Sequence, residues 1–256
     1  MSDSSNRGRE VVPLRSVLSD QTYDLIREMI FSHEIEPGQR VNIDALSVLL
    51  KVSQTPVREA LARLGSDGLI AKEALKGYTA TNLLSAQEFS DLFDFRLLIE
   101  PWAAESAARR ATRTEGIALN DEVVLAKKVI KDDSENQWEA LTQHDSRFHS
   151  LVAELSGNSS VKDAFQRTHC HLHQFRLFIA TQKKFLSESS QMPTTQSLFE
   201  RYYQSTSGAA AIKDHGVIAK AIMAKDPKAA RDAMRAHIEA SHKKLQTAMT
   251  AVNAKE

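Results

Sequence analysis

The feature that most constrains this chain is a helical pattern that continues almost without interruption from Ser85 to about residue 250. Apolar residues recur there at spacings of three and four, and few Gly or Pro residues break the pattern. The whole chain holds 9 Gly and 6 Pro among 256 residues, which disfavours a turn-rich β architecture. We therefore predict a mainly α protein whose larger part is an all-helical antiparallel bundle.

Local end signals divide this region into separate helices. Ser85 and Glu88 have the spacing of a capping box, which begins a helix. The pairs Gly157-Asn158 and Asp226-Pro227 mark further boundaries. The predicted helices cover residues 86–111, 114–131, 136–156, 160–182, 212–225 and 227–250. We interpret residues 183–211, which are rich in Ser, Thr and Gln, as a loop with one short helix.

A different pattern precedes the bundle. Apolar spacing predicts helices over residues 14–33, 44–50 and about 54–66, with Asp44 as the cap or first-turn acid of the second helix. The following segment, LIAKEALKGYTAT, alternates between apolar and polar residues and holds Gly77 where a hairpin bend is expected. Three helices followed by a β-ribbon are typical of a winged helix-turn-helix.

The chain is long enough for two domains. We predict a flexible arm over 1–13, the winged helix-turn-helix over 14–82, and a helical ligand-sensing and dimerisation domain over 83–250. No stretch has the about eighteen apolar residues that a membrane span needs, and the polar opening lacks a signal-peptide core. The single cysteine, Cys170, fits a reducing compartment. We therefore expect a cytoplasmic protein with no membrane partner.

The third helix carries the candidate DNA contacts. Its apolar residues line one face, so Thr55 and Arg58 project outward near its start. Free N–H groups at a helix start attract phosphate, and a bidentate arginine–guanine contact is worth about 1–3 kcal/mol of discrimination. The alternative is a capped surface helix with a solvated arginine. Residues 14–80 hold eight Lys and Arg against nine Asp and Glu, so DNA binding requires the cations to be sorted onto one face.

The run VSQTPVREALARLGSDGLI, followed by KGYTA, resembles the DNA-binding domain of the GntR-type regulators, where the pattern is close to VSRTPVREALRRLEAEGLV with a wing glycine. The resemblance implies contacts to double-stranded operator DNA from Arg40, Ser53, Gln54, Thr55, Arg58, Lys76 and Gly77. Two departures matter. Gln54 replaces the usual arginine, and Lys51 stands where the family has a turn glycine, which predicts a strained backbone or an altered turn.

Four residues of the helical region have the spacing of a metal site. Asp145 and His149 lie at i and i+4, so a helix places both on one face. His215 and His237 each lie 11 residues from Asp226, so an antiparallel hairpin that turns there brings them to the same height. Three imidazoles and a carboxylate suit a divalent transition metal such as Zn, Ni or Mn. The alternative is that the Asp145–His149 spacing arises by chance, because nine histidines in 256 residues generate some i,i+4 pairs.

The same region resembles the FCD domain of the FadR-like branch of GntR regulators. The runs that carry the resemblance are LFDFRLLIEPWAAESAARRA, DSRFHSLVAELSGN and KDHGVIAKAIMAKDPKAARDAMRAHI. It implies that Asp145, His149, His215 and His237 are the metal ligands, and that Arg96 is a pocket residue that clamps a carboxylate. A structural i,i+4 pair of Arg96 with Glu100 stays an equally open interpretation.

A second histidine cluster lies at His169, His171 and His173. On one continuous helix His169 and His173 share a face and His171 points away, so the three cannot bind one metal. We interpret His173 and Arg176 first as core-edge or surface residues, with a ligand-binding role for both as the alternative. Trp102 is predicted to lie in the core.

These patterns predict a homodimeric transcription regulator and not an enzyme. Two recognition helices would fit a pseudo-palindromic operator, and a small organic acid would complete the metal shell. The resemblance implies repression relieved by that metabolite, with activation as the alternative. One rival is a metallohydrolase or lyase, although no base comparable to the Glu of HExxH lies nearby. Another is a helical interaction module whose metal is purely structural.

Overall fold

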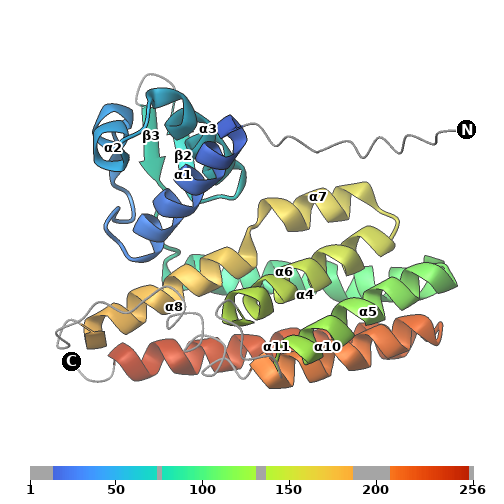
Figure 1. Ribbon diagram of the computed structural model, residues 1–256. Coiled ribbons are helices and arrows are strands. Elements are labelled where there is room, and N and C mark those ends of the chain that lie inside the picture. Colours follow the sequence, from blue (N-terminus) through green and yellow to red (C-terminus); the bar gives the residue numbers. More distant parts are fainter. Residues whose placement is uncertain (1–13, 74–76, 131–136, 187–207, 254–256) are drawn as a thin grey trace, which may run out of the picture. The chain divides into compact units, whose positions relative to one another are not determined.

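The computed structural model describes residues 14–73, 77–130, 137–186 and 208–253 (Figure 1). The chain divides into two compact units, Met1–Asn82 and Leu83–Glu256. The first unit combines helices with a small sheet, and the described part of the second unit is helical. The fold is thus mainly α, as predicted.

The N-terminal unit is a winged helix-turn-helix. Its helices are α1 (Leu14–Phe31), α2 (Ile43–Leu50) and α3 (Gln54–Ser66), and its strands are β1 (Arg40–Val41), β2 (Ile70–Glu73) and β3 (Gly77–Ala80). The three strands form an antiparallel sheet in the order β1-β3-β2. Because β2 pairs with β3 from Ile70 opposite Ala80 to Glu73 opposite Gly77, the predicted β-ribbon is present.

Apolar side chains between α1 and α3 hold this unit together. Ile26 and Ile30 of α1 and Leu61 and Leu64 of α3 are each at most 1% exposed, and the two helices pack against each other. Complete burial of a side chain of this size contributes about 1.5–3 kcal/mol. This packing leaves the opposite face of α3 to the solvent.

The turn between α2 and α3 is built without glycine. Asn42, and not Asp44, caps α2, because its side chain accepts hydrogen bonds from the N–H groups of Asp44 and Ala45. Lys51 ends α2 in the left-handed region, with φ of 56°, which costs a residue with a Cβ roughly 1–2 kcal/mol. The prediction of a strained backbone at Lys51 is therefore confirmed.

The C-terminal unit is a bundle of helices that run side by side (Figure 1). They are α4 (Ala86–Arg110), α5 (Arg113–Val129), α6 (Gln137–Leu155), α7 (Ser159–Arg167), α8 (Cys170–Leu186), α10 (Gly208–Met223) and α11 (Pro227–Asn253). Ser85 and Glu88 form the predicted capping box of α4, and Thr112 and Glu115 form another at α5. Because α6, α10 and α11 all contact α4, this long helix lies at the centre of the bundle.

The α10–α11 pair is the hairpin expected from the sequence. Lys225 ends the first helix at φ of 56°, and Asp226 accepts a hydrogen bond of 2.9 Å from the N–H of Ala229 at the start of the second. The two helices pack along each other. Residues equally distant from this turn are thereby brought together.

One predicted helix is wrong. Residues 160–182 were expected to be continuous, but α7 ends at Arg167 and α8 begins at Cys170. His169 between them takes φ of 44°, so α8 does not continue the helical register of α7. Of the predicted loop over 183–211, residues 187–207 lie outside the described residues.

None of the helices in the described part of the chain combines the length and the apolar character that a bilayer crossing requires.

Candidate functional site

The exposed face of α3 carries most of the predicted DNA contacts. Gln54, Thr55 and Arg58 are exposed on its first turns, next to the exposed Ser53. Ser53 precedes the helix, but its side chain makes no capping hydrogen bond. The start of α3 therefore presents N–H groups and polar side chains to the solvent, which is an arrangement suited to phosphates and base edges.

Gln54 connects α2 with Arg58. Its Nε2 donates to Asp44 Oδ1 at 2.5 Å, and its Oε1 accepts from Arg58 Nη2 at 3.1 Å. The residue that replaces the family's usual arginine thus contacts the arginine one helical turn later. This chain of hydrogen bonds orients the Arg58 guanidinium on the exposed face.

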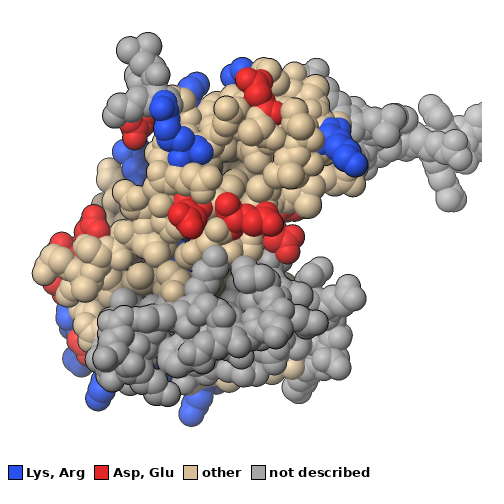
Figure 2. Space-filling view, turned by 90° about the vertical axis from the view of Figure 1, so that its left-hand side faces the viewer, with Lys and Arg blue, Asp and Glu red and all other residues tan. Residues whose placement is uncertain are grey.

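The wing lies on the same unit. Gly77 begins β3 with φ of +85° and is exposed, and no heavy atom lies within 4 Å of the position that a Cβ would take. Arg40 is exposed on β1 opposite Thr79, and Lys76 lies outside the described residues. Figure 2 shows Lys and Arg side chains exposed on the surface, with Asp and Glu side chains among them.

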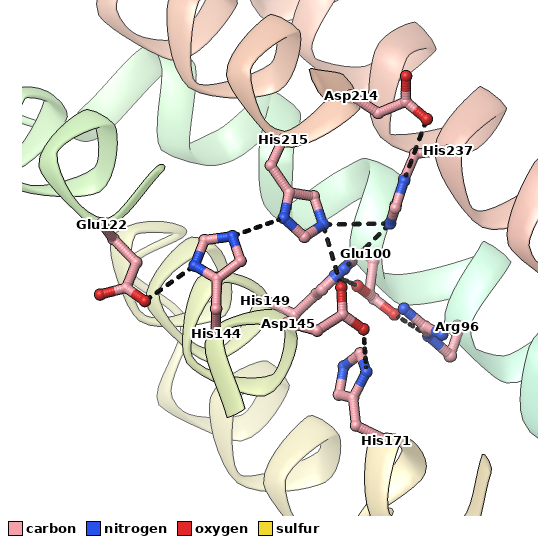
Figure 3. A network of polar contacts seen from close by, with 10 residues as sticks. All are labelled: Arg96, Glu100, Glu122, His144, Asp145, His149, His171, Asp214, His215 and His237. Atoms are coloured by element: carbon pink, nitrogen blue, oxygen red, sulfur yellow. Dashed lines mark hydrogen bonds and ion pairs between the residues drawn. The ribbon is translucent and has the colours of Figure 1, made fainter. Parts of the chain in front are cut away.

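The four predicted metal ligands meet inside the C-terminal unit (Figure 3). Asp145 and His149 project from α6, His215 from α10 and His237 from α11. One ligand atom of each lies within 4.8 Å of those of the other three. His237 Nε2 lies 3.2 Å from His149 Nε2 and 3.3 Å from His215 Nε2. Asp145 Oδ1 lies 3.3 Å from His215 Nε2.

These separations fit a shared metal ion. With metal–nitrogen bonds of about 2.1 Å, two ligand atoms lie about 3.0 Å apart at a right angle and about 3.4 Å apart at the tetrahedral angle. The observed nitrogen–nitrogen distances of 3.2 and 3.3 Å fall between these limits. The four side chains thus have both the donor chemistry and the spacing of a divalent transition-metal site.

Carboxylates determine where two of the imidazoles carry their protons. Glu100 Oε2 contacts His149 Nδ1, and Asp214 Oδ2 lies 3.5 Å from His237 Nδ1. A carboxylate accepts and does not donate, so His149 Nδ1 bears the proton and its Nε2 keeps a lone pair. His237 Nδ1 makes no hydrogen bond among the described residues, and the nearby Asp214 charge favours the same proton position there. Two lone pairs that face each other repel, and a cation between them would remove that repulsion.

The electrostatics of the site favour neutral imidazoles at His149 and His215 beside an ionised Asp145. Burial lowers the pKa of His149 to about 4, although Glu100 acts in the opposite direction. Burial also holds the pKa of His215 well below its ordinary value. Burial opposes ionisation of Asp145, but the surrounding histidines hold the pKa of its carboxyl well below the ordinary value. These are the protonation states that bind a divalent metal.

His171 is a residue beside the predicted metal ligands to which sequence reasoning gave no role. His171 is 6% exposed, and its Nδ1 lies 2.6 Å from Asp145 Oδ2. Burial disfavours its charged form, but Cys170 and Asp145 raise the pKa of His171 to about 10. The sequence analysis compared His171 only with His169 and His173 on one continuous helix, whereas the break at His169 gives α8 its own register.

His144 is a second residue that sequence reasoning missed. It is 1% exposed, and its Nε2 lies 3.1 Å from His215 Nδ1. The available signal was its place directly before Asp145, because a helix with two inward-facing ligands also buries some of their neighbours.

Arg96 reaches the four predicted metal ligands through Glu100. It is 1% exposed, and its Nε donates to Glu100 Oε1 at 2.5 Å, so the structural i,i+4 pair is present. Glu100 in turn contacts His149. Arg96 Nη2 is buried and has no hydrogen-bond partner among the described residues. One part of the guanidinium therefore supports the cluster while another is left unpaired.

The remaining candidates lie in different surroundings. His173 lines an open pocket of about 330 Å³ with Glu88, Phe95 and other residues outside the metal cluster. Arg176 is 3% exposed, and burial lowers its pKa to about 10. Trp102 is 45% exposed, so its predicted place in the core is wrong, because its helix turns that position outward.

Comparison with known proteins finds relatives of both units. Residues 18–78 match the model of the bacterial regulatory proteins of the gntR family, and residues 91–240 match the FCD domain. The Nta operon transcriptional regulator of Aminobacter aminovorans is 31% identical over 175 residues, which are 68% of this chain and 80% of the relative. The HTH-type transcriptional repressor GlaR of Escherichia coli is 23% identical over 235 residues, 91% of this chain and 98% of the relative.

Solved structures share the fold. McbR/YncC of E. coli covers 93% of this chain and 98% of its own, with a TM-score of 0.53 and 18% identity. A protein described as a GntR transcriptional regulator from Rhodococcus sp. RHA1 covers 90% of this chain and 97% of its own length, with a TM-score of 0.56 and 17% identity. The named relatives are transcriptional regulators and not metal-dependent hydrolases or lyases. This chain belongs to the GntR family of bacterial transcriptional regulators and carries an FCD effector-binding domain.

Proposed function

We propose that this regulator is a homodimeric repressor that releases its operator when a small organic acid binds at a divalent metal in the FCD domain. The ligand can change DNA affinity only as far as it favours one arrangement of the two units over another. The relative described as the repressor GlaR supports repression as the sign of control.

The DNA contacts are assigned to the exposed face of the winged helix-turn-helix. Thr55 and Arg58 reach base edges, with Gln54 orienting Arg58 and Ser53 near the phosphates at the helix start. Arg40 and Lys76 pair with phosphates, and Gly77 allows the wing to approach the DNA closely. Exposure of the described members of this set and the hydrogen bond from Arg58 to Gln54 support the assignment.

The metal is assigned to Asp145, His149, His215 and His237. A zinc, nickel or manganese ion held by these four ligands would keep coordination positions for the oxygens of a carboxylate. Arg96 Nη2, which lacks a partner among the described residues, supports a pocket that receives an anionic group. Arg176 adds a second buried guanidinium on α8. His173 belongs to a separate pocket, so we leave it out of the effector site.

The dimer is assigned to the FCD domain. Leu98 and Trp102 lie one turn apart on α4 and are 77% and 45% exposed, and apolar side chains of this size are commonly covered at protein interfaces. A dimer would place two recognition helices on the two halves of a pseudo-palindromic operator.

One observation carries the proposal: three imidazoles and one carboxylate converge inside the bundle with their ligand atoms within 4.8 Å of one another. The test is operator binding by the purified, zinc-loaded protein, measured on its own promoter region and on random duplex at several salt concentrations. Acetate, lactate and gluconate are then added separately. We expect preference for the promoter and release by at least one acid.

Equal affinity for the promoter region and random duplex would refute the proposal that the protein is a sequence-specific regulator. Promoter preference that no acid changes and that persists after chelation would refute the role of the metal in sensing. A structural metal would instead unfold the domain on chelation.

A further inference from the structure

His144 and Glu122 form a buried extension of the metal cluster. His144 lies on α6 immediately before Asp145 and is 1% exposed. Its Nε2 lies 3.1 Å from His215 Nδ1, and its Nδ1 lies 2.9 Å from Glu122 Oε1 on α5 (Figure 3). Arg147 Nε donates to the same Glu122 oxygen at 3.0 Å. Three helices, α5, α6 and α10, are connected by this chain of contacts.

The protons on this chain can be placed by counting donors and acceptors. The Glu122 carboxylate only accepts, so His144 Nδ1 carries a proton and donates it. A neutral imidazole that donates from Nδ1 has a lone pair on Nε2. At 3.1 Å this Nε2 accepts, and the donor is His215 Nδ1–H. This leaves His215 Nε2 with a lone pair directed at His237 and Asp145.

His144 does for His215 what the Glu100 carboxylate does directly for His149. Glu100 contacts His149 Nδ1, and Asp214 lies near His237 Nδ1. His215 Nδ1 has no carboxylate contact among the contacts of the described residues; it meets an imidazole instead. The His144 imidazole lies between His215 and Glu122. The Glu122 carboxylate therefore polarises the His144 ring, and this makes His144 Nε2 a stronger acceptor for His215 Nδ1–H.

We propose that His144, together with Glu122, is a positioning residue that holds His215 in the Nδ1–H form and aims its Nε2 at the metal. This inference rests on the metal site proposed above. Outer partners of this kind commonly change metal affinity roughly 10–100-fold. Loss of the acceptor would also leave the buried His215 Nδ1–H without a partner, which favours the other proton position and turns an N–H toward the metal.

The test measures zinc affinity by competition with a chromophoric chelator in the full-length protein. His144→Phe keeps a flat ring beside Phe148, whose centroid lies 6.1 Å away, but removes the acceptor. We expect a loss of zinc affinity of roughly 10–100-fold. His144→Gln, whose amide oxygen can accept from His215, should recover part of that loss. Arg147→Ala is the matched control, because it contacts Glu122 without contacting the ring chain, and it should leave zinc affinity close to that of the wild type.

A second measurement reports the proton position directly. In metal-free protein with ¹⁵N-labelled histidine, the His215 signals are assigned by their absence in His215→Ala. We expect Nδ1–H in the wild type and Nε2–H in His144→Phe. If His144→Phe does not fold, Glu122→Gln takes its place. A neutral acceptor forms a hydrogen bond roughly half as strong as an ionised one, so this variant should lose zinc affinity by a smaller factor.

The outcomes separate this inference from the proposed function. A wild type that binds no zinc would refute the metal site itself. Zinc binding that His215→Ala abolishes, but that His144→Phe leaves unchanged with His215 still in the Nδ1–H form, would overturn the role of His144 alone. Where Glu122→Gln replaces an unfolded His144→Phe, zinc affinity equal to that of Arg147→Ala would overturn it as well.

Discussion

Arg58 on α3 and Arg96 on α4 show how differently the two units use the same side chain. Arg58 is exposed and bonds to the neutral Gln54. Arg96 is 1% exposed and bonds to Glu100, which contacts His149, one of the proposed metal ligands. An exposed contact residue contributes to affinity without carrying the fold, whereas a buried supporting residue contributes to both. Substitutions should therefore separate affinity from stability in the first unit and change them together in the second.

The largest expected effect is that of Arg96→Leu. Removal of the guanidinium leaves Glu100, 3% exposed, as a buried charge without its main partner, which costs about 3–5 kcal/mol. The free energy of unfolding is measured by urea titration. Arg109→Ala is the matched control, because Arg109 pairs with Glu105 at the same spacing on the same helix but is 62% exposed at its side chain. Arg109→Ala should lower the free energy of unfolding by less than about 1 kcal/mol. Equal losses in Arg96→Leu and Arg109→Ala would contradict the difference between the buried and the exposed pair.

Metal removal comes next. Free zinc at about 100 times its dissociation constant should stabilise the folded C-terminal unit by about 2.7 kcal/mol. Both tryptophans, Trp102 and Trp138, lie after residue 83, so tryptophan fluorescence reports on this unit alone. Chelator should lower the unfolding temperature of the wild type, measured by this fluorescence, and should have no effect on that of His237→Ala.

His242→Ala provides the control for that measurement. His242 lies on α11 with His237 but stacks on Phe93 with centroids 4.4 Å apart. Its substitution should preserve the response to chelator. An unchanged wild-type unfolding temperature after complete chelation would show that the cluster does not bind zinc in the folded state.

Arg58→Ala tests the exposed side of the comparison. Loss of a bidentate base contact should weaken operator binding by about 1–3 kcal/mol while the unfolding free energy stays within about 0.5 kcal/mol of the wild type. Fluorescence anisotropy with labelled operator measures the first quantity. Arg63→Ala is the control on the same helix, because Arg63 pairs with Asp20 at 2.5 Å. If both variants lose operator affinity equally, Arg58 is not a base-reading residue.

The smallest effect is expected from Tyr23→Phe in the N-terminal unit. The Tyr23 hydroxyl donates to Asp67 Oδ2 at 2.8 Å, and its loss should cost about 1 kcal/mol. Burial, with Asp67, raises the pKa of Tyr23 from 10.0 to about 12. The unfolded state therefore loses this proton first, and wild-type stability should fall between these two pH values more steeply than that of Tyr23→Phe. If the unfolding free energies of the wild type and Tyr23→Phe fall in parallel as the pH rises, the burial of the Tyr23 hydroxyl is contradicted.

Local signals predicted those parts of the molecule that depend on local geometry. The Ser85–Glu88 capping box and the alternation before Gly77 are short-range patterns, and the structure has both. The i,i+4 spacing of Asp145 and His149 depends only on a helix, and the hairpin needed only a turn at Asp226. These elements follow from periodicity because few long-range contacts are involved.

The supporting residues of the metal cluster could not be predicted in the same way. Glu100, Glu122 and Asp214 contact histidines on other helices, and such pairs depend on how the helices pack. His171 was missed because the break before α8 has no glycine or proline to mark it. Trp102 was misplaced because an apolar residue on a helix indicates burial without saying whether a neighbour covers it.

The short joint at Thr168 and His169 has a consequence for how related proteins diverge. A helix advances by about 100° per residue, so one inserted or deleted residue there would rotate α8 about its own axis. A different side chain would then take the place of His171 beside Asp145, while the four proposed metal ligands on α6, α10 and α11 would keep their places. The surroundings of the proposed site can thus change through the length of one connection.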